Sequence, residues 1–364
     1  MAKNGNLHNA KNAKNDEFYT QYEDIEAEMN AYIEYDKDVF RGKTVLCPCD
    51  DPEWSNFTKY FAANFERLGL KKFISTSYAP NSGLQKASLW EEESEQYDAE
   101  KHEKCGRLFI LDEDTNGSGR IDKEDLKWSY LSGNGDFRSE EVTAIRDEAD
   151  FIITNPPFSL FREFIAWVMA GNKKFAVIGN MNAITYKEIF PLIRDNKIWL
   201  GNNSGGSIKG NSMFFVVMDE YNNSYVEEKN GTRLMQVSGK WFSNIDHGKR
   251  HEKLSCMSVA DNLRYNKKLI KKLNGNYGVP EYPKYDNYDA IEVPFSDAIP
   301  SDYEGVMGVP ISFLDKYNPE QFEIVDINPH FFSVVEKGGK KPKQLTIAGA
   351  KDPYARILIK KKDR

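Results

Sequence analysis

The sequence contains little cysteine and no long apolar run. Its 364 residues include four cysteines, and Cys47 and Cys49 stand too close together to form an ordinary disulfide with each other. Thiols without a disulfide framework are typical of a reducing compartment, so the sequence predicts a cytoplasmic protein. No segment approaches the roughly 20 apolar residues that a membrane span needs, and residues 1–18 lack the apolar stretch of a secretory signal. We therefore expect neither a membrane protein nor a secreted disulfide-rich domain.

Recognisable metal-binding patterns are also scarce. The five histidines show no ligand spacing, and Cys47 and Cys49 do not have the Cys-x-x-Cys spacing of zinc sites. Only residues 114–125 fit a calcium-loop pattern, with acids at its first and last positions. The last acid is Asp125, which is shorter than the usual bidentate Glu, and the preceding run 107–111 is strand-like. We therefore predict a hairpin turn and no metal site here, with a calcium loop as the alternative.

Basic residues are outnumbered by acidic ones overall but are concentrated in the C-terminal third. The chain has 49 Lys and Arg against 56 Asp and Glu, which gives a net charge of −7. Residues 249–272 nevertheless hold eight basic residues against two acidic ones, and residues 336–364 hold ten against three, whereas residues 91–125 hold five against thirteen. Basic segments of this kind favour a polyanionic partner, although each run alone is also typical of a solvated surface.

Short apolar runs alternate with helical patterns over residues 1–240. The expected elements are strands at 43–47, 72–78, 151–154, 174–179 and 213–218, helices at 16–40, 55–69, 139–149 and 160–170, and an inserted hairpin within 81–135. This alternation predicts an α/β fold with a doubly wound, mostly parallel, Rossmann-like sheet. Beyond residue 241 the alternation stops, so we predict a smaller irregular domain at 241–335 and a basic C-terminal tail at 336–364.

The clearest chemical signal is the loop formed by Asn155, Pro156, Pro157 and Phe158, which directly follows the predicted strand at 151–154. It is expected at the carboxyl edge of the sheet, where open α/β sheets bind ligands. The prolines fix φ and stiffen the loop, so the side-chain oxygen of Asn155 and the carbonyl of Pro156 are expected to converge on one point. Two acceptors there suit an exocyclic amino group, and Phe158 could stack on the ring that bears it. An ordinary strand-to-helix turn is the alternative explanation.

Asn-Pro-Pro-Phe resembles the signature of the amino-methyltransferases that use S-adenosyl-L-methionine, and specifically their adenine-N6 branch. Residues 16–20 resemble the N-terminal cofactor motif of these enzymes, and residues 133–137 resemble the motif that holds the cofactor's adenine. Together with segments 241–250 and 305–314, these motifs make the sequence similar to the EcoRI-type adenine-specific DNA methyltransferase family over about residues 15–330. The order of the motifs resembles the gamma arrangement.

The resemblance implies a fold, a cofactor and a set of residues. It implies a methyltransferase domain at 1–240, a target recognition domain at 241–335, and S-adenosyl-L-methionine as the cofactor. The catalytic residues would be Asn155, Pro156, Pro157 and Phe158. The cofactor-binding residues would be Phe18, Tyr19, Thr20, Cys47, Pro48, Asp50, Asp51, Tyr78, Asp136 and Phe137.

Two features of the cofactor region depart from the wider superfamily. The loop after the first strand has no glycine, although the EcoRI-type family itself carries Cys and Asp there, and Asp50 or Asp51 is expected to hold the methionine ammonium. No acid follows the second strand, so Ser77 or Tyr78 would have to bind the ribose. The alternative for residues 16–20 is a helix start without a ligand, and the alternative for Asp50 and Asp51 is a solvated turn. For Asp136 and Phe137 the alternative is a turn residue followed by a core residue.

The basic C-terminal third is expected to contact DNA. Residues expected to meet phosphates are Lys249, Arg250, Lys267, Lys268 and Lys271. Nearby tyrosines that could stack against bases are Tyr265, Tyr277, Tyr282, Tyr285 and Tyr288. A solvated helix followed by a packed loop is the alternative.

The resemblance also implies partners and a biological setting. The expected substrate is a flipped-out adenine in double-stranded DNA, methylated at N6 by a monomer. A cognate restriction nuclease in the same restriction–modification system is a further expected partner. The alternatives are a methyltransferase of RNA adenine or of protein glutamine, or a non-catalytic DNA-binding protein on the same fold.

Overall fold

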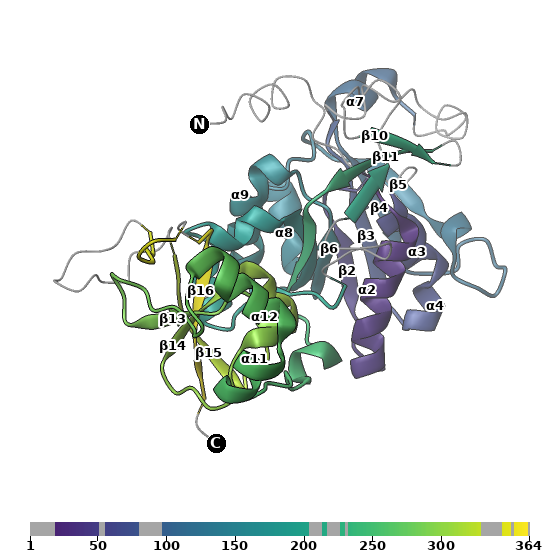
Figure 1. Cartoon of the computed structure of the whole chain (residues 1–364). Helices are drawn as coiled ribbons and strands as arrows, with labels where there is room; N and C mark the ends of the chain where they lie inside the picture. Colours follow the sequence, from purple (N-terminus) through teal and green to yellow (C-terminus); the bar gives the residue numbers. More distant parts are fainter. Residues whose placement is uncertain are drawn as a thin grey trace. The chain divides into compact units, whose positions relative to one another are not determined.

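Figure 1 shows a computed structural model of the 364-residue chain. The structure describes residues 19–50, 55–79, 97–203, 213–216, 226–229, 232–328, 344–350 and 353–362. The chain divides into two compact units, the first formed by Met1–Met181 and Asn203–His247 and the second by Asn182–Asn202 and Gly248–Arg364. The change of unit at residue 247 differs from the predicted boundary at 240, and residues 182–202 join the second unit rather than the first.

The first unit is built around a sheet whose strands follow the order β5-β4-β3-β2-β6-β7-β12. Its parallel strands are β2 (Thr44–Cys47), β3 (Lys72–Thr76), β6 (Phe151–Thr154) and β7 (Lys174–Asn180). Its antiparallel strands are β4 (Arg107–Leu111), β5 (Lys127–Tyr130) and β12 (Gly239–Ser243). Every residue of β2 and β6 is buried, as expected for central strands covered on both faces. The predicted doubly wound, mostly parallel α/β sheet is confirmed.

Helices cover both faces of this sheet. Figure 1 shows α2, α3 and α4 on one side and α8 and α9 on the other. The helices of this unit are α2 (Tyr22–Tyr35), α3 (Asn56–Ala63), α4 (Phe65–Leu68), α7 (Ala99–Lys104), α8 (Glu140–Glu148) and α9 (Phe161–Ala170). The helix predicted from residue 55 is capped by Ser55, whose hydroxyl accepts a hydrogen bond from the backbone N–H of Phe57. The chain leaves α4 at Gly69, whose φ of 63° is the left-handed conformation that ends many helices.

Aromatic rings fill the core between the sheet and α3. Phe61 of α3 stacks on Phe73 of β3 with the ring centroids 5.6 Å apart. Phe57, one turn earlier, meets the fully buried Trp241 of β12 edge to face at 6.0 Å. Such ring pairs stabilise packing beyond the area that they bury. They fix the first turn of α3 next to the carboxyl ends of the strands.

Residues 107–130 form the predicted inserted hairpin. β4 and β5 pair antiparallel, with Phe109 opposite Trp128. In the intervening turn, the Asp114 carboxylate accepts backbone N–H groups at 2.7 Å, and the Asp125 carboxylate accepts others at 2.8 Å. The two acids therefore close the turn by binding its own backbone, and the hairpin prediction is confirmed.

A second, smaller sheet in the first unit is entirely antiparallel. Its order is β1 (Tyr19–Thr20), β9 (Met213–Val216), β11 (Thr232–Val237) and β10 (Val226–Lys229). Two predictions are therefore wrong. The strand expected at 213–218 belongs to this sheet and not to the doubly wound one, and the helix expected from residue 16 begins only at Tyr22. The two residues of β1 become a strand because a partner almost 200 positions away pairs with them.

The second unit contains its own sheet in the order β13-β14-β16-β15. The strands are β13 (Ala290–Glu292), β14 (Val306–Pro310), β15 (Phe322–Asn328) and β16 (Arg356–Lys361), and β8 (Trp199–Leu200), α10 (Phe190–Arg194), α11 (Val259–Tyr265) and α12 (Lys267–Lys272) also belong to this unit. The predicted smaller C-terminal domain is present, but it contains a regular sheet, and residues 356–361 of the expected tail form one of its strands. β16 pairs with β14 and β15, and Ile357, Leu358 and Ile359 are fully buried between them. Residues 336–343, 351–352 and 363–364 of the expected tail lie outside the described residues.

A buried ion pair in this second unit links β13 to β16, two strands that are separated in the sheet by β14. Glu292 of β13 is fully buried, and its carboxylate accepts hydrogen bonds from Arg356 of β16 at 2.7 Å (Nη2) and 3.0 Å (Nε). The hydroxyls of Tyr277 and Tyr285 also donate to this carboxylate. Burial, followed by the charge of Glu292, raises the pKa of Tyr285 well above its ordinary value, so this phenol stays neutral and keeps donating.

No helix in the parts of the chain that the structure describes is long and apolar enough to cross a membrane.

Candidate active site

The order of the strands identifies the edge of the sheet where a ligand is expected. The chain passes from β2 outward to β3 and then returns to the other side of β2 with β6 and β7. Open α/β sheets bind their ligands at the carboxyl ends of the strands, where the strand order reverses. Here this point lies between β2 and β6. The loops that leave these two strands carry Pro48 to Asp50 on one side and Asn155 to Phe158 on the other.

Asp50 lies where these two loops meet. Its carboxylate accepts a hydrogen bond from Thr154 Oγ1 at 2.5 Å and another from Ser55 Oγ at 2.6 Å. Its backbone N–H donates to the carbonyl of Thr76 at 3.1 Å, and its carbonyl accepts from Ser75 Oγ at 2.5 Å. The side chain is only 6% exposed. The predicted cofactor residue is therefore a fixed, buried carboxylate that contacts the residue preceding Asn155.

The loop from Asn155 to Phe158 directly follows β6 and is largely shielded from solvent. Pro156 is buried, and the other three residues are partly buried. Pro157 leads directly into a short 3₁₀ turn at Phe158–Leu160, and the backbone N–H of Leu160 donates to the carbonyl of Pro157 at 2.9 Å. The Phe158 ring meets Phe215 of β9 edge to face, with the centroids 6.2 Å apart. The loop is thus held at both ends, by β6 and by this aromatic contact.

Thr20 of the predicted N-terminal cofactor motif reaches the same place. It pairs with Phe215, and its carbonyl accepts a hydrogen bond from Asn56 Nδ2 at 2.8 Å. Its own hydroxyl oxygen is buried and has no hydrogen-bond partner among the residues that the structure describes. Phe18 and Asp51 lie outside the described residues, and Tyr19 is described only by its backbone.

These contacts form a closed ring around the sheet edge. Hydrogen bonds, strand pairing, ring contact or the chain itself link Asn155, Thr154, Asp50, Ser55, Asn56, Thr20, Phe215 and Phe158 in that order. The ring joins segments from four separate stretches of sequence, at residues 20, 50–56, 154–158 and 215. We refer to it as the site ring.

Four members of the site ring were not predicted from the sequence as site residues. Thr154 directly precedes the predicted site residue Asn155, and Ser55 begins the helix predicted at 55–69. Asn56 and Phe215 carry no motif. The signal that could have identified Thr154 is its position as the last residue of a central strand, because such residues face the ligand edge.

Tyr78, which follows β3, lies beside the loop 133–137, which follows β5. Gly135 has φ of 79°, and a Cβ atom there would lie 2.0 Å from the carbonyl oxygen of Ser77, so only glycine fits this approach. The backbone N–H of Ala79 donates to the carbonyl of Asn134 at 2.8 Å. The Ser77 hydroxyl accepts a hydrogen bond from the backbone N–H of Arg107, and Ser77 is only 4% exposed. Tyr78, in contrast, is 37% exposed. Of the two residues proposed for the ribose, Tyr78 is the more accessible.

The two predicted adenine-binding residues differ in their surroundings. Asp136 accepts hydrogen bonds from Arg138 Nε at 2.9 Å and Nη2 at 2.6 Å, and this contact lowers the pKa of its carboxyl below the ordinary value. Phe137 is 4% exposed and packs edge to face against Phe164 and Trp167 of α9. Phe137 therefore has the core-packing role that the sequence left open as the alternative, and its ring is not presented to a ligand.

Cys47 and Pro48 lie on the core side of the site and contact the protein interior. The Cys47 side chain is fully buried in the aromatic core, and burial, followed by the nearby charge of Asp50, raises the pKa of its thiol well above the ordinary value. The carbonyl of buried Pro48 accepts from Thr76 Oγ1 at 3.1 Å. The prediction that the Cys47 side chain binds a ligand is not supported by this burial, because core residues enclose the thiol.

The predicted DNA contacts in the second unit need one correction. Arg250 is only 7% exposed, its guanidinium lies 3.5 Å above the ring of Trp199, and it donates to Asn196 at 2.7 Å. It is a structural residue of this unit, because its cationic head is already used within the protein. Lys249 is partly buried and donates to the carbonyl of Asn202 at 2.9 Å.

The lysines of α12 remain accessible. Lys267, Lys268 and Lys271 are all exposed. Lys268 lies 3.9 Å from an Asp297 carboxylate oxygen and 3.9 Å above the ring of Phe295, whereas Tyr265 beside this helix is 59% exposed. Among the other tyrosines, Tyr282 and Tyr285 are buried, with 7% and 2% exposure, so they cannot stack on bases.

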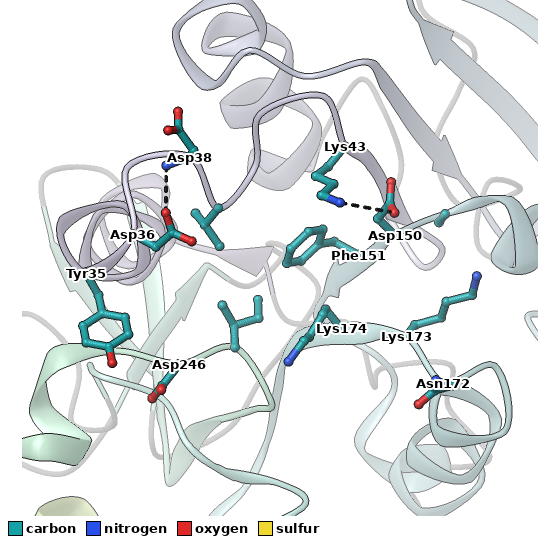
Figure 2. A pocket seen from close by; sticks show the side chains of 13 residues that line it. Tyr35, Asp36, Asp38, Lys43, Asp150, Phe151, Asn172, Lys173, Lys174 and Asp246 are labelled. Carbon is teal, nitrogen blue, oxygen red and sulfur yellow. Dashed lines mark hydrogen bonds and ion pairs between the residues drawn. The ribbon is translucent and has the colours of Figure 1, made fainter.

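A cavity of about 540 Å³ lies at the opposite edge of the main sheet (Figure 2). Lys43 and Asp150, which precede β2 and β6, line it and approach each other to 3.9 Å, and Lys174 begins β7 beside them. These residues mark the amino ends of the parallel strands. The cavity is therefore separate from the site ring, which surrounds the carboxyl ends.

A doubly wound sheet with an Asn-Pro-Pro-Phe loop at its switch point defines a Rossmann-like amino-methyltransferase. The family described as "Adenine-specific methyltransferase EcoRI" matches residues 6–362. The chain belongs to this family of adenine-specific methyltransferases, as the sequence analysis expected.

Curated relatives agree with this assignment. The chain is 42% identical to "Type II methyltransferase M.EcoRI" of Escherichia coli, over all of this chain and 99% of the relative. It is 34% identical to "Type II methyltransferase M.MgeORF184P" of Mycoplasma genitalium, over 97% of both chains. It is 33% identical to "Type II methyltransferase M.MpnI" of Mycoplasma pneumoniae, over 88% of this chain and 86% of the relative. No solved structure matches the chain at a comparable level.

Proposed function

We propose that this protein transfers a methyl group from S-adenosyl-L-methionine to the N6 amine of adenine at a specific sequence in double-stranded DNA. The observation that carries the proposal is the hydrogen bond between Asp50, in the loop after β2, and Thr154, which directly precedes the Asn155–Phe158 loop at the switch point of the sheet. A methyltransferase needs a donor site and an acceptor site side by side. The two loops meet at this point through Thr154.

The residues at this edge suit S-adenosyl-L-methionine. Asp50 is a buried carboxylate that can face the cationic amino-acid part, and Thr20 contributes a buried hydroxyl oxygen without a partner among the described residues. Tyr78, Asp136 and the backbone near Pro48 are the proposed contacts to the nucleoside part. When bound, this cofactor supplies a methyl group activated by a sulfonium, whose departing thioether is neutral.

The amine loop performs the acceptor side of the reaction. An adenine amine is a poor nucleophile because its nitrogen lone pair is delocalised into the ring. In our proposal the Asn155 side-chain oxygen and the Pro156 carbonyl accept hydrogen bonds from its two N–H groups, which favours the pyramidal, more nucleophilic nitrogen, and one of these protons leaves after the N–CH3 bond has formed. Phe158 stacks on the purine and fixes its plane. Alignment and oriented acceptors supply the rate, so this chain needs no covalent intermediate.

The target adenine has to leave the helix to reach this site. Its amine is enclosed within a base pair, so the protein is proposed to flip the nucleotide out of the duplex. We assign sequence recognition to the second unit, which carries the exposed lysines of α12. We further propose that the protein acts as a monomer in the cytoplasm, in a restriction–modification system with a cognate restriction nuclease, as the type II names of its relatives suggest.

Transfer of labelled methyl to different acceptors tests this function. The purified chain, incubated with labelled S-adenosyl-L-methionine, is expected to label unmethylated duplex DNA, with the label recovered as N6-methyladenine at one sequence. RNA and a glutamine-containing protein substrate should remain at background. Label in RNA or protein but not in DNA would support the corresponding alternative methyltransferase, and absence of both cofactor binding and transfer would support a non-catalytic DNA-binding protein.

The exposed lysines of α12 yield a prediction about DNA affinity. Replacing Lys267, Lys268 and Lys271 by Ala should weaken duplex binding about 10- to 100-fold and reduce the salt slope of log K by about 2–3, since each phosphate contact contributes about 0.9. Lys268 should contribute least because Asp297 lies beside it. Fluorescence anisotropy with a labelled duplex, measured over a salt series, gives both quantities.

The control for this prediction is a triple substitution elsewhere. Lys101, Lys104 and Lys123 are also exposed but lie in the acidic inserted region. Their replacement by Ala removes the same charge and should leave the salt slope unchanged. Equal slopes for both triple variants would mean that α12 does not contact phosphates.

A further inference from the structure

We propose that Thr154 is a positioning residue that ties the amine loop to the cofactor loop through the Asp50 carboxylate. The inference rests on the proposed function, because it assigns donor and acceptor roles to these two loops. Thr154 is the last residue of β6 and directly precedes Asn155. Its hydroxyl donates to Asp50, 104 positions away in sequence, at 2.5 Å.

The tie is short and shielded from water. Thr154 is fully buried and Asp50 is 6% exposed, so water does not compete strongly for either group. A hydroxyl that donates to a carboxylate forms a shorter and stronger bond than two neutral groups do. The Thr154 side chain therefore fixes the end of β6 relative to the loop that follows β2.

Asp50 itself has little freedom to move. Ser55, at the start of α3, donates to the other carboxylate oxygen at 2.6 Å. The backbone of Asp50 is bonded on both sides, with its N–H donating to Thr76 and its carbonyl accepting from Ser75. The carboxylate is thus held by β3 and α3 before Thr154 contacts it, so Thr154 is anchored to a rigid point.

The two hydroxyls orient the carboxylate without cancelling its charge. Thr154 and Ser55 are neutral donors, so neither of these two contacts cancels the negative charge of Asp50, which lies at the edge where the cationic cofactor is proposed to bind. The same contact orients Asn155 through one peptide unit. A single hydrogen bond therefore links the Asp50 carboxylate, which attracts the cationic methyl donor, to Asn155, whose side-chain oxygen orients the adenine amine.

Loss of this bond should affect rate more than stability. A displacement of about 1 Å between reacting groups can cost about 100-fold in rate. Thr154→Val keeps the shape of the side chain and removes the hydroxyl. We expect it to slow single-turnover methyl transfer about 10- to 100-fold and to weaken the affinity for S-adenosyl-L-methionine about 3- to 10-fold. Thr154→Ser retains the hydroxyl and should remain within about threefold of the wild type in both quantities.

Thr143→Val serves as the matched control. Thr143 lies on α8 in the same unit, and its hydroxyl accepts a hydrogen bond from Trp167 Nε1 at 3.0 Å. The substitution also removes a hydroxyl with one hydrogen bond, but away from the site ring. It should lower the melting temperature by no more than Thr154→Val does, because its contact is neutral and Thr143 is only partly buried, while rate and cofactor affinity stay at wild-type values.

Calorimetry with S-adenosyl-L-methionine in the absence of DNA, and single-turnover transfer to duplex DNA, separate the outcomes. Losses in Thr154→Val that Thr154→Ser restores support the tie. Wild-type affinity and rate in Thr154→Val, equal losses in the Ser variant, or equal losses in Thr143→Val overturn it. If the wild-type protein binds the cofactor but does not label DNA, the proposed function fails, and the affinities of the Val and Ser variants still decide whether the tie exists.

Discussion

Replacing Asn155 by Ala should lower methyl transfer to duplex DNA by about 10²–10³-fold or more, the cost of removing one oriented hydrogen-bonding group from a developing charge. The side-chain oxygen of Asn155 is one of the two proposed acceptors for the adenine amine. Without this oxygen, one N6–H group has no hydrogen-bond acceptor, and the amine nitrogen stays planar and poorly nucleophilic. The proposed cofactor contacts lie on Asp50 and Thr20, so the affinity for S-adenosyl-L-methionine should change by less than about twofold.

Single-turnover incorporation of labelled methyl measures this effect, and calorimetry measures the cofactor affinity. Asn244→Ala is a useful control, because Asn244 is also a partly buried amide, and it is hydrogen-bonded to the backbone of Phe175 and Lys173. Its loss should reduce stability but leave transfer intact. Unchanged transfer in Asn155→Ala would remove the proposed role of the amine loop.

Replacing Arg356 by Met should destabilise the second unit by about 3–5 kcal/mol, because it leaves a buried charge without its counter-ion. Glu292 is fully buried, and Arg356 supplies both the opposite charge and hydrogen bonds to it. The hydroxyls of Tyr277 and Tyr285 remain, but both are neutral. The strands β13 and β16 that carry the pair should become the most affected elements.

Hydrogen–deuterium exchange of the full chain locates this loss. Peptides from β13 to β16 should lose protection, while β2, β6 and β7 of the first unit should not. The double variant Glu292→Met with Arg356→Met should recover much of the stability, since apolar replacement of a buried ion pair is often neutral or stabilising. A double variant as unstable as Arg356→Met alone would show that the charge imbalance is not the cause.

The two parts of the chain differ in how far their sequence predicted their structure. β2 and β6 were predictable because a central parallel strand is buried on both faces and reads as a continuous apolar run. β16 was not, because Arg356 on one side and Lys360, Lys361 and Lys362 on the other made Ile357, Leu358 and Ile359 look like part of a basic tail. β1 was missed for a related reason. Two residues carry no periodicity, and their strand geometry comes from pairing with Val216 and Phe215.

The candidate site shows the same division. The Asn155–Phe158 loop could be located from sequence because two prolines after a strand restrict the backbone locally. The surroundings of Phe137 and Arg250 could not be predicted from the sequence because their residue types suit both a ligand contact and a packed interior. Only the neighbours decided between these roles, namely Phe164 and Trp167 for the phenylalanine and Trp199 for the arginine.

The sequence alone determined the class of fold, the position of the Asn155–Phe158 loop and the family, because each depends on short-range features such as apolar runs, proline positions and motif order. The tertiary structure alone decided which side chains meet. Asp50 and Thr154 are 104 positions apart, and no local pattern in either segment specifies their hydrogen bond. That contact exists because the chain crosses over so that β2 and β6 become neighbours, and sheet pairing of this kind is set by the packing of the whole unit.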